Sequence, residues 1–305
     1  MKNLSAMTLG TVQLGLNYGI ANNEGKPSRE KSFSILNAAL QNGINCLDTA
    51  RGYGDSEEVI GEFLKSYKGE KPAIVTKIPK LQGDSPKALE KFVTEAMEKS
   101  LSALGVNKVD AVMLHGSSDP KIYGSACANA MKTLITNGYT NKVGVSIYTS
   151  DEIEEMLKYD VFSLTQVPMS IFDQRLIIDG SINKLKERDY TVFVRSVFLQ
   201  GLFFLNPDTM TDPILVEHVA PRLYLLNEIA EEENMSIAQL AIAFIRDLKG
   251  VSSLVLGADT PEQVLTNVAC FDTKPLSSEI MNKLQKEFTN IDIPEIMKVL
   301  SRPKN

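Results

Sequence analysis

The sequence contains few cysteines and few histidines, and it has no apolar run long enough to span a membrane. Its three cysteines, Cys46, Cys127 and Cys270, are widely separated and odd in number, which argues against a disulfide framework and against a metal-binding knuckle. The N-terminal residues 1–7 include too few apolar side chains for the core of a secretion signal. These absences predict a cytoplasmic protein with reduced cysteines, no bound metal and no membrane partner.

Positive charge is also scarce. The 305 residues include 32 lysines and arginines against 38 aspartates and glutamates, which gives a formal net charge of −6 at pH 7. Proteins that bind nucleic acids usually carry clustered basic residues, and the sequence shows no such cluster. We therefore expect no nucleic-acid partner, whereas the oligomeric state cannot be predicted from the sequence.

Short apolar runs recur about every 30 to 40 residues and alternate with amphipathic windows, a pattern typical of repeated strand and helix units. The expected strands are residues 8–13, 44–48, 73–77, 109–114, 142–146, 163–167, 191–196 and 253–256. The expected helices are residues 30–41, 56–66, 86–104, 122–137, 151–158, 178–188, 221–234 joined by 237–248, and 261–271. This alternation predicts an α/β fold, a TIM (β/α)8 barrel, with a doubly wound open sheet as the alternative.

No low-complexity tract or flexible linker divides the sequence. We therefore expect residues 1–305 to form a single domain, with residues 290–305 as a C-terminal tail that either folds over the active face or hangs free. The longest irregular stretch, 199–218, is expected to lie over the same face, where long loops usually bind something.

A few side chains with useful chemistry end, or closely follow, three of the expected strands. They are Asp48, Tyr53, Lys77 and His115. The C-terminal ends of barrel strands all open onto one face, so these side chains are expected to converge there. A phenol such as Tyr53 donates a proton at neutral pH only with help from a nearby cation, which Lys77 can provide. A buried ammonium in turn needs a carboxylate, which Asp48 supplies.

Together with His115, which could orient a carbonyl oxygen, this group would protonate the alkoxide that forms when a carbonyl accepts hydride from a bound nicotinamide. Taken singly, however, each of these residues has an ordinary structural explanation. A strand-end histidine is more often hydrogen-bonded within the fold than catalytic, and a lone Asp–Lys pair is usually structural. The order of the motifs along the chain adds the information that the single residues lack.

In that order the chain resembles the aldo-keto reductase family over nearly its whole length. The motifs that carry the resemblance are LGT at 9–11, LDTARGYG at 47–54, SE at 56–57 with IG at 60–61, VTK at 75–77, LH at 114–115, GVS at 144–146, QVP at 166–168, and Gly257 with PEQ at 261–263 and Asn267. Members of this family are (β/α)8 barrels that use NADPH, less often NADH, to reduce carbonyl compounds. The resemblance implies the same fold and cofactor class for this chain.

The resemblance also implies roles for individual residues. Tyr53 matches the general acid, Lys77 and Asp48 the pair that tunes it, and His115 the residue that orients the substrate. Ser146 and Gln166 match the positions that bind the carboxamide of the nicotinamide. The full set of implied cofactor contacts is Gly10, Thr11, Asp48, Ser146, Gln166, Arg195, Ser196, Gly257, Gln263 and Asn267.

The chain departs from the family pattern at both ends of the implied cofactor site. Arg195 stands where many members place an aromatic side chain on the nicotinamide, and a cation there would disfavour the oxidised ring. At the other end, Gly257, Ala258 and Gln263 replace the cations that commonly bind the 2'-phosphate, and Asp259 adds a negative charge. NADPH is the expected cofactor on the family pattern, with NADH as the other possibility.

The predicted function is therefore NAD(P)H-dependent reduction of an aldehyde or ketone, with a sugar-like molecule as one candidate substrate. The alternative is a regulatory or interaction protein that binds cofactor on the same barrel with little turnover. A third hypothesis is a lyase that uses Lys77 as a Schiff-base nucleophile. Further pocket residues suggested by their places after strand ends are Arg51, Phe172, Gln174, Arg175 and Arg195.

Overall fold

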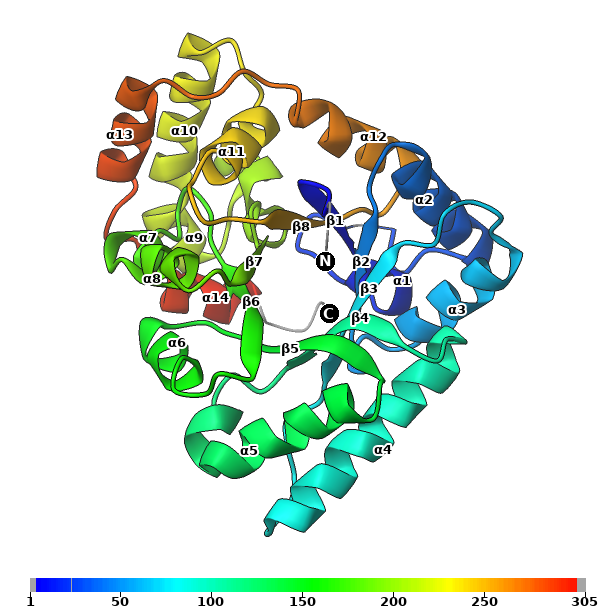
Figure 1. Ribbon diagram of the computed structural model, residues 1–305. Helices are drawn as coiled ribbons and strands as arrows, with labels where there is room; N and C mark the ends of the chain where they lie inside the picture. Colours follow the sequence, from blue (N-terminus) through cyan, green and yellow to red (C-terminus); the bar gives the residue numbers. More distant parts are fainter. Residues whose placement is uncertain (1–3, 23, 301–305) are drawn as a thin grey trace.

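The computed structural model describes residues 4–22 and 24–300. Within these residues, eight parallel strands close into a barrel in chain order, and β8 pairs with β1 (Figure 1). The strands are β1 (Met7–Gly10), β2 (Cys46–Asp48), β3 (Ala73–Ile78), β4 (Val109–Leu114), β5 (Thr140–Ser146), β6 (Phe162–Pro168), β7 (Thr191–Arg195) and β8 (Ser253–Gly257). The structure confirms the predicted TIM barrel and excludes the doubly wound sheet.

Helices cover the outside of the barrel (Figure 1). Those in the first half of the chain are α1 (Val12–Gly15), α2 (Arg29–Gln41), α3 (Ser56–Ser66), α4 (Pro86–Leu104), α5 (Asp119–Thr136) and α6 (Ser150–Met156). The second half contains α7 (Arg175–Ile178), α8 (Ser181–Glu187), the 3-10 helices η1 (Leu199–Phe204) and η2 (Pro207–Thr209), α9 (Pro213–His218), α10 (Ala220–Glu232), α11 (Ile237–Arg246), α12 (Pro261–Cys270), α13 (Ser278–Glu287) and α14 (Ile293–Leu300). No helix among the described residues has the length and apolar character that crossing a membrane requires.

The inside of the barrel is filled by a small apolar cluster, which is separate from the larger core between strands and helices. This inner cluster consists of Cys46, Val75, Ala111, Met113, Leu164 and Phe193. Residues two apart on a strand point to the same side. The residues that come two positions after members of the inner cluster are Asp48, Lys77, His115, Gln166 and Arg195. Strand alternation therefore places these five side chains in the next layer, at the C-terminal mouth of the barrel.

Local sequence signals account for several helix boundaries. The Ser85 side chain accepts a hydrogen bond from the Ala88 amide and Pro86 occupies the first turn of α4, as the sequence predicts. The same helix ends at Gly105, which adopts φ +66. Capping thus explains why the third barrel helix begins and ends where the sequence analysis places it.

The first predicted strand, 8–13, is wrong at its C-terminal end. The strand stops at Gly10, and residues from Val12 form the short helix α1. Thr11 turns the chain out of the sheet because its amide and its Oγ1 both donate to the carbonyl oxygen of Asp48, at 3.0 and 2.9 Å. The apolar spacing of this short segment suits a strand and a helical turn equally well, so periodicity alone could not separate them.

Other boundaries also differ from prediction. The helix expected at 178–188 begins only at Ser181, as α8, because Gly180 adopts φ +78 and separates it from α7. The stretch 199–218, expected to be irregular, contains η1, η2 and α9, the last capped by the Asp212 side chain. Helix α13 was not predicted, although Ser277 provides the N-cap. Part of the predicted tail forms α14, which packs against α9 and buries four apolar side chains; residues 301–305 lie outside the described residues.

Candidate active site

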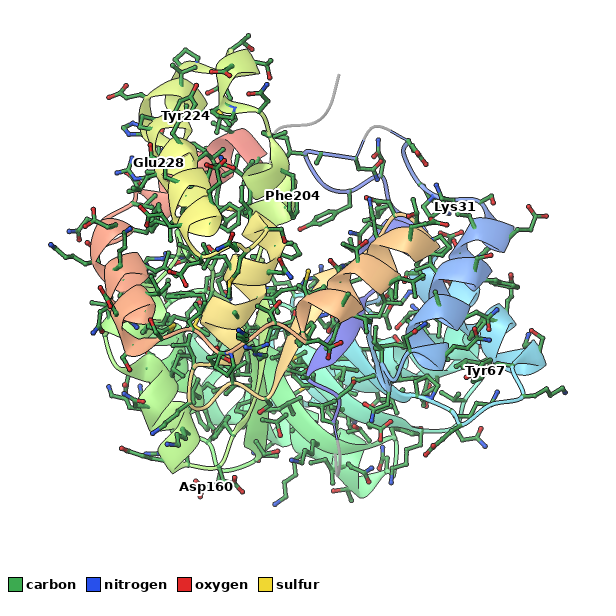
Figure 2. All side chains as sticks on the ribbon, turned by 90° about the horizontal axis from the view of Figure 1, so that it is seen from above. Lys31, Tyr67, Asp160, Phe204, Tyr224 and Glu228 are labelled. Atoms are coloured by element: carbon green, nitrogen blue, oxygen red, sulfur yellow. The ribbon has the colours of Figure 1, made fainter. Side chains whose placement is uncertain are left out.

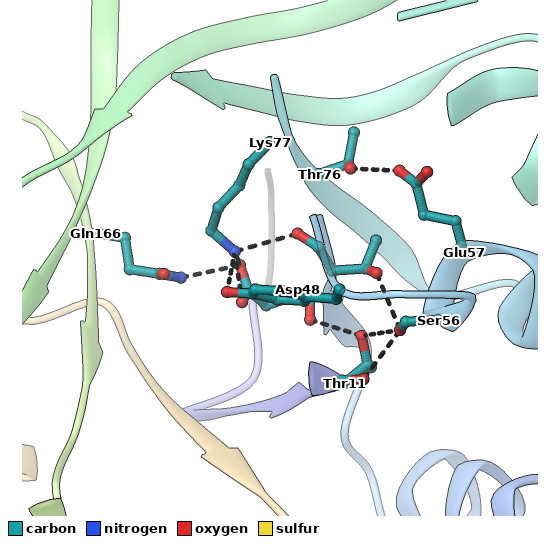
Figure 3. A network of polar contacts seen from close by, with 9 residues as sticks. Thr11, Asp48, Ser56, Glu57, Thr76, Lys77 and Gln166 are labelled. Carbon is teal, nitrogen blue, oxygen red and sulfur yellow. Dashed lines mark hydrogen bonds and ion pairs between the residues drawn. The ribbon is translucent and has the colours of Figure 1, made fainter. Parts of the chain in front are cut away.

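Lys77 is fully buried near the end of β3, and its Nζ donates to both carboxylate oxygens of Asp48 at 2.7 Å (Figure 3). It also donates to the carbonyl oxygen of Thr49 at 3.1 Å and to the phenol oxygen of Tyr53 at 3.3 Å. Burial acts to lower the pKa of Lys77, but the charge of Asp48 and the contacts with Tyr53 outweigh it and raise this pKa. The amine therefore stays protonated, which argues against the Schiff-base hypothesis.

The direction of the contact between Lys77 and Tyr53 matters for chemistry. An ammonium can only donate hydrogen bonds, so the phenol oxygen must accept. The proton of the Tyr53 hydroxyl is consequently not used by Lys77 and can point into the cavity that Tyr53 lines. An adjacent cation would also stabilise the phenolate that remains once this proton has been given away.

Asp48 is held from several sides, so its carboxylate has a fixed position. Gln166 Nε2, from β6, donates to Asp48 Oδ1 at 2.9 Å. On the opposite side, the backbone of Asp48 is bound by Thr11, and Ser56 Oγ lies 2.9 Å from the Thr11 carbonyl oxygen and 2.8 Å from its Oγ1 (Figure 3). Strands β1, β2, β3 and β6 thus contribute to one rigid polar network beneath the mouth of the barrel.

Two glycines allow the backbone below Tyr53 to pack closely against α1. A Cβ on Gly15 would lie 1.8 Å from the carbonyl oxygen of Tyr53, and a Cβ on Gly54 would lie 2.3 Å from the carbonyl oxygen of Gly15. Gly54 in addition adopts φ +58, a conformation that glycine takes without strain. Sequence reasoning missed Gly15 as a positioning residue, because a single glycine in an apolar segment carries no signal of what it contacts.

His115 lies beside the phenol ring. The ring centroids of Tyr53 and His115 are 5.7 Å apart, with the planes at 85°. Burial lowers the pKa of His115 to about 4, and the charges of Lys77 and Arg195 push it the same way. The imidazole is therefore neutral at neutral pH, so it can bind a carbonyl oxygen or hydroxyl without carrying charge.

A cavity of about 410 Å3 opens at this place. It extends from Asp48 and Tyr53 along the ends of β1 and β8 to Asp259 and the start of α12. Of the cofactor contacts implied by the resemblance, those that line it are Gly10, Thr11, Asp48, Gln166, Arg195, Ser196, Gly257, Gln263 and Asn267. Ser146 is not among the lining residues, although its backbone is in register with Gln166 on the neighbouring strand.

Two loops provide part of the cavity wall. One belongs to the 199–218 stretch, which the sequence analysis places over the active face without naming its lining residues, and the other follows α1. The missed lining residues include Gln13, Tyr18, Asn22, Phe198, Gln200 and Phe204. The two loops meet, because the Ile20 amide donates to the Gln200 carbonyl oxygen at 2.9 Å. Phe204 is 52% exposed and lies at the opposite end of the molecule from Asp160, which precedes β6 (Figure 2). Such loop residues have no strand-end position to mark them in the sequence.

Most of the additional pocket residues suggested by the sequence have structural contacts instead. Arg51 forms ion pairs with Glu57 and Glu58, at 2.7 and 2.9 Å. Arg175 binds both carboxylate oxygens of Asp173. Phe172 packs between Phe203 and Phe288, and Gln174 donates to the carbonyl oxygens of Ile171 and Leu284. Of that group, only Arg195 lines the cavity.

Comparison with known proteins agrees with the barrel fold. The model of the Aldo/keto reductase family matches residues 6–287, and the chain belongs to this family. An NADH-specific methylglyoxal reductase of Escherichia coli (strain K12) is 27% identical over 305 residues, which cover 88% of this chain and 90% of the relative. The family predicted from the sequence motifs is thereby confirmed.

Two further proteins show how widely this barrel is used. A putative voltage-gated potassium channel subunit beta of Schizosaccharomyces pombe is 27% identical over 329 residues, covering 95% of this chain and 93% of the relative. The solved structure of a holo aldo-keto reductase from Bacillus halodurans matches with a TM-score of 0.75 and 24% identity, over 93% of this chain and 92% of that one. The second comparison supports the fold alone.

Proposed function

We propose that the chain reduces an aldehyde or ketone to an alcohol, with Tyr53 as the proton donor. The observation that carries the proposal is the fully buried Lys77, which holds Asp48 and contacts the phenol oxygen at the edge of the cavity. A bound reduced nicotinamide would supply the hydride. The alkoxide that results takes the proton of Tyr53, and Lys77 stabilises the phenolate left behind.

The residues present fit a dinucleotide cofactor. Among the described residues, two buried polar atoms at the cavity, Gln13 Oε1 and Arg195 Nη2, have no hydrogen-bond partner, so an acceptor and a donor remain for a ligand. Near Tyr53, Arg195 and Gln166 would hold the nicotinamide half, and Gln13, whose side-chain amide lies beside Gly257 at the end of β8, would meet the cofactor farther along the cavity. At the far end, the backbone amides at the start of α12 would face the other half.

We propose NADH as the preferred hydride donor, although the resemblance alone pointed to NADPH. The side chains that line the far end are Asn22, Asp259, Gln263, Thr266 and Asn267, and none of them carries positive charge. Asp259 accepts a hydrogen bond from Asn22 at 3.0 Å and would repel a 2'-phosphate, whereas a ribose hydroxyl can donate to it. The printed name of the Escherichia coli relative, an NADH-specific reductase, points the same way.

The substrate class is a small carbonyl compound. Tyr18, Tyr53, Tyr148, His115 and Arg195 gather at the reaction end, and the aromatic rings with their hydroxyl groups suit a polar molecule such as an oxo-aldehyde or a sugar. That the protein acts in the cytoplasm, and that residues 1–305 form one domain, stay predictions from the sequence.

The test is a fluorescence titration of the purified protein with NADH and with NADPH, followed by a panel of aldehydes, oxo-aldehydes and sugars. We expect tighter binding of NADH and oxidation of the bound cofactor by at least one member of the panel. The matched control is heat-denatured protein with the same panel. Failure to bind either cofactor would contradict the proposal.

The second candidate is a cofactor-binding regulatory protein with little turnover. The observation that favours it is the similarity to the potassium channel subunit beta of Schizosaccharomyces pombe, which spans nearly the whole of both chains. Cofactor binding without oxidation by any carbonyl compound in the panel would support this candidate over the reductase. The complete set of Asp48, Tyr53, Lys77 and His115 favours the reductase.

A further inference from the structure

Arg195 is the one cation among the described residues that line the cavity, and its contacts leave it available to a ligand. It ends β7, is partly buried, and stacks its guanidinium on the ring of Tyr148, with Cζ 4.3 Å from the ring centroid. Nη1 is 3.4 Å from Ser196 Oγ, which is a weak contact. Nη2 is buried and has no partner among residues 4–22 and 24–300.

The charge of Arg195 is not compensated by the protein around it. Within the described residues it forms no ion pair, and the nearby carboxylate of Asp48 is already bound by Lys77 and Gln166. The Asp48–Lys77 pair is neutral as a unit, and His115 is uncharged at neutral pH. The reaction end of the cavity therefore holds one net positive charge, whose field reaches His115 and Tyr18.

We propose that Arg195 makes this site bind the reduced nicotinamide more tightly than the oxidised one, so that the protein takes up the reduced cofactor and releases the oxidised one. The inference rests on the proposed function. The two forms of the cofactor have nearly the same shape, but the oxidised ring carries a positive charge and the reduced ring is neutral. An uncompensated cation in the same cavity discriminates between them by charge.

The charge of Arg195 bears on the hydride-transfer step. Reduction moves a hydride, with its two electrons, from the reduced ring to the carbonyl carbon, and a proton from Tyr53 to the carbonyl oxygen. A nicotinamide ring held near Tyr53 would become cationic in that step, in the cavity that Arg195 lines. Tighter binding of the reduced form shifts the equilibrium between the bound forms toward the reduced cofactor by the same factor, so Arg195 would favour occupancy by NADH rather than the hydride step itself. Repulsion of the oxidised form also favours its release after turnover.

The experiment measures the dissociation constants of NADH and NAD+ for the full chain, by fluorescence for NADH and by its displacement for NAD+. The variants are Arg195→Gln, which removes the charge, and Arg195→Lys, which keeps it. We expect the ratio Kd(NAD+)/Kd(NADH) to fall about tenfold in Arg195→Gln and to stay within about twofold of wild type in Arg195→Lys. Circular dichroism and the thermal midpoint establish that both variants are folded.

An unchanged ratio in Arg195→Gln overturns the inference while leaving the proposed function in place. Equal weakening of both cofactors overturns it too, because Arg195 would then bind a group that NADH and NAD+ share, such as the pyrophosphate. An unchanged ratio with a raised KM for anionic substrates alone would instead make Arg195 a substrate contact. If the wild-type protein binds neither cofactor, the proposed function itself fails.

Discussion

Lys77 and Arg195 are two cations at the same barrel mouth, but within the described residues only Lys77 forms an ion pair. Lys77 is fully buried and donates to Asp48, Thr49 and Tyr53. Arg195 is partly exposed, rests on an aromatic ring and has a buried nitrogen without a partner among the described residues. One charge is satisfied within the fold, whereas the other is left for a ligand.

The difference indicates a division of labour. A buried ion pair with extra hydrogen bonds has a fixed geometry before any ligand arrives, which suits groups that must move a proton. A cation without an ion pair acts electrostatically on any ligand that enters the cavity. Substitutions that alter the surroundings of one cation at a time separate these two roles.

The largest effect is expected from Lys77→Met, which removes the ion pair between Lys77 and Asp48. The change leaves Asp48 as a buried charge without its partner, so stability should fall by about 3–5 kcal/mol. Turnover should fall by about a hundredfold or more, because Tyr53 loses its adjacent cation. Urea unfolding and steady-state rates measure the two effects.

The matched control is the double variant Asp48→Asn with Lys77→Met, which removes both charges. We expect it to regain much of the stability but none of the turnover, because the buried charge is gone while the cation is still missing. Full turnover in Lys77→Met would show that the phenol does not depend on Lys77.

The charges of both cations act on His115, so its titration reports on both. Burial and these charges hold its pKa at about 4, whereas an unfolded histidine titrates near 6.5. As pH falls, the histidine of the unfolded chain therefore takes up a proton before folded His115 does. The contribution of His115 to the free energy of unfolding is complete above pH 6.5 and is lost as pH falls to 4. Relative to His115→Gln, the free energy of unfolding of the wild type should fall by roughly 2–3 kcal/mol between pH 6.5 and pH 4.

Urea unfolding at a series of pH values measures this loss, and the other titrating groups cancel when wild type and His115→Gln are compared. A difference between the two proteins that does not change with pH would contradict the depressed pKa of His115.

Gly15→Ala alters the backbone geometry at Tyr53, the residue that Lys77 contacts, without changing a charge. The new methyl group would collide with the carbonyl oxygen of Tyr53, so the loop that carries the phenol must shift. Misplacement of a reacting group lowers the rate more than it lowers binding. We expect turnover to fall about tenfold with little change in the Kd for NADH, and stopped-flow rates alongside titrations would show whether binding suffers equally.

The smallest effect is expected at the far end of the cavity. Asp259→Asn removes the negative charge there while keeping a similar shape. We expect kcat/KM with NADPH to rise about threefold relative to NADH, because a 2'-phosphate would no longer meet a carboxylate. Competition assays with both cofactors measure the ratio, and Glu262→Gln, outside the cavity lining, serves as the control. An unchanged preference would mean that Asp259 does not face the ribose.

Much of the barrel could be predicted because each strand and helix pair carries its own periodic pattern. Asp48, Lys77 and His115 could be found from their places at strand ends, where alternation sends their side chains inward. Helix α13 and the C-terminal limit of β1 were missed, because short segments with two or three apolar residues fit more than one structure. Thr11 ends β1 through a tertiary contact with Asp48 that no local pattern encodes.

The candidate site was predicted less completely than the fold. Strand-end position singled out Arg195, which lines the cavity, but it could not distinguish Arg195 from Arg51 and Arg175, whose partners are Glu57 and Asp173. Proximity in sequence does not separate the three arginines either, because Asp189 lies six residues before Arg195. Tyr18 reaches the cavity through tertiary packing, which the sequence does not display, whereas Phe204 lies in the 199–218 stretch that the sequence analysis places over the active face.

The most direct test of the account is a single-turnover measurement on Tyr53→Phe with reduced cofactor already bound. We predict that the Kd for NADH stays within about twofold of wild type, because the ring shape is kept. The rate of cofactor oxidation should fall at least a hundredfold, because the proton donor is gone. A rate above about a tenth of the wild-type value would contradict the assignment of Tyr53 as the acid.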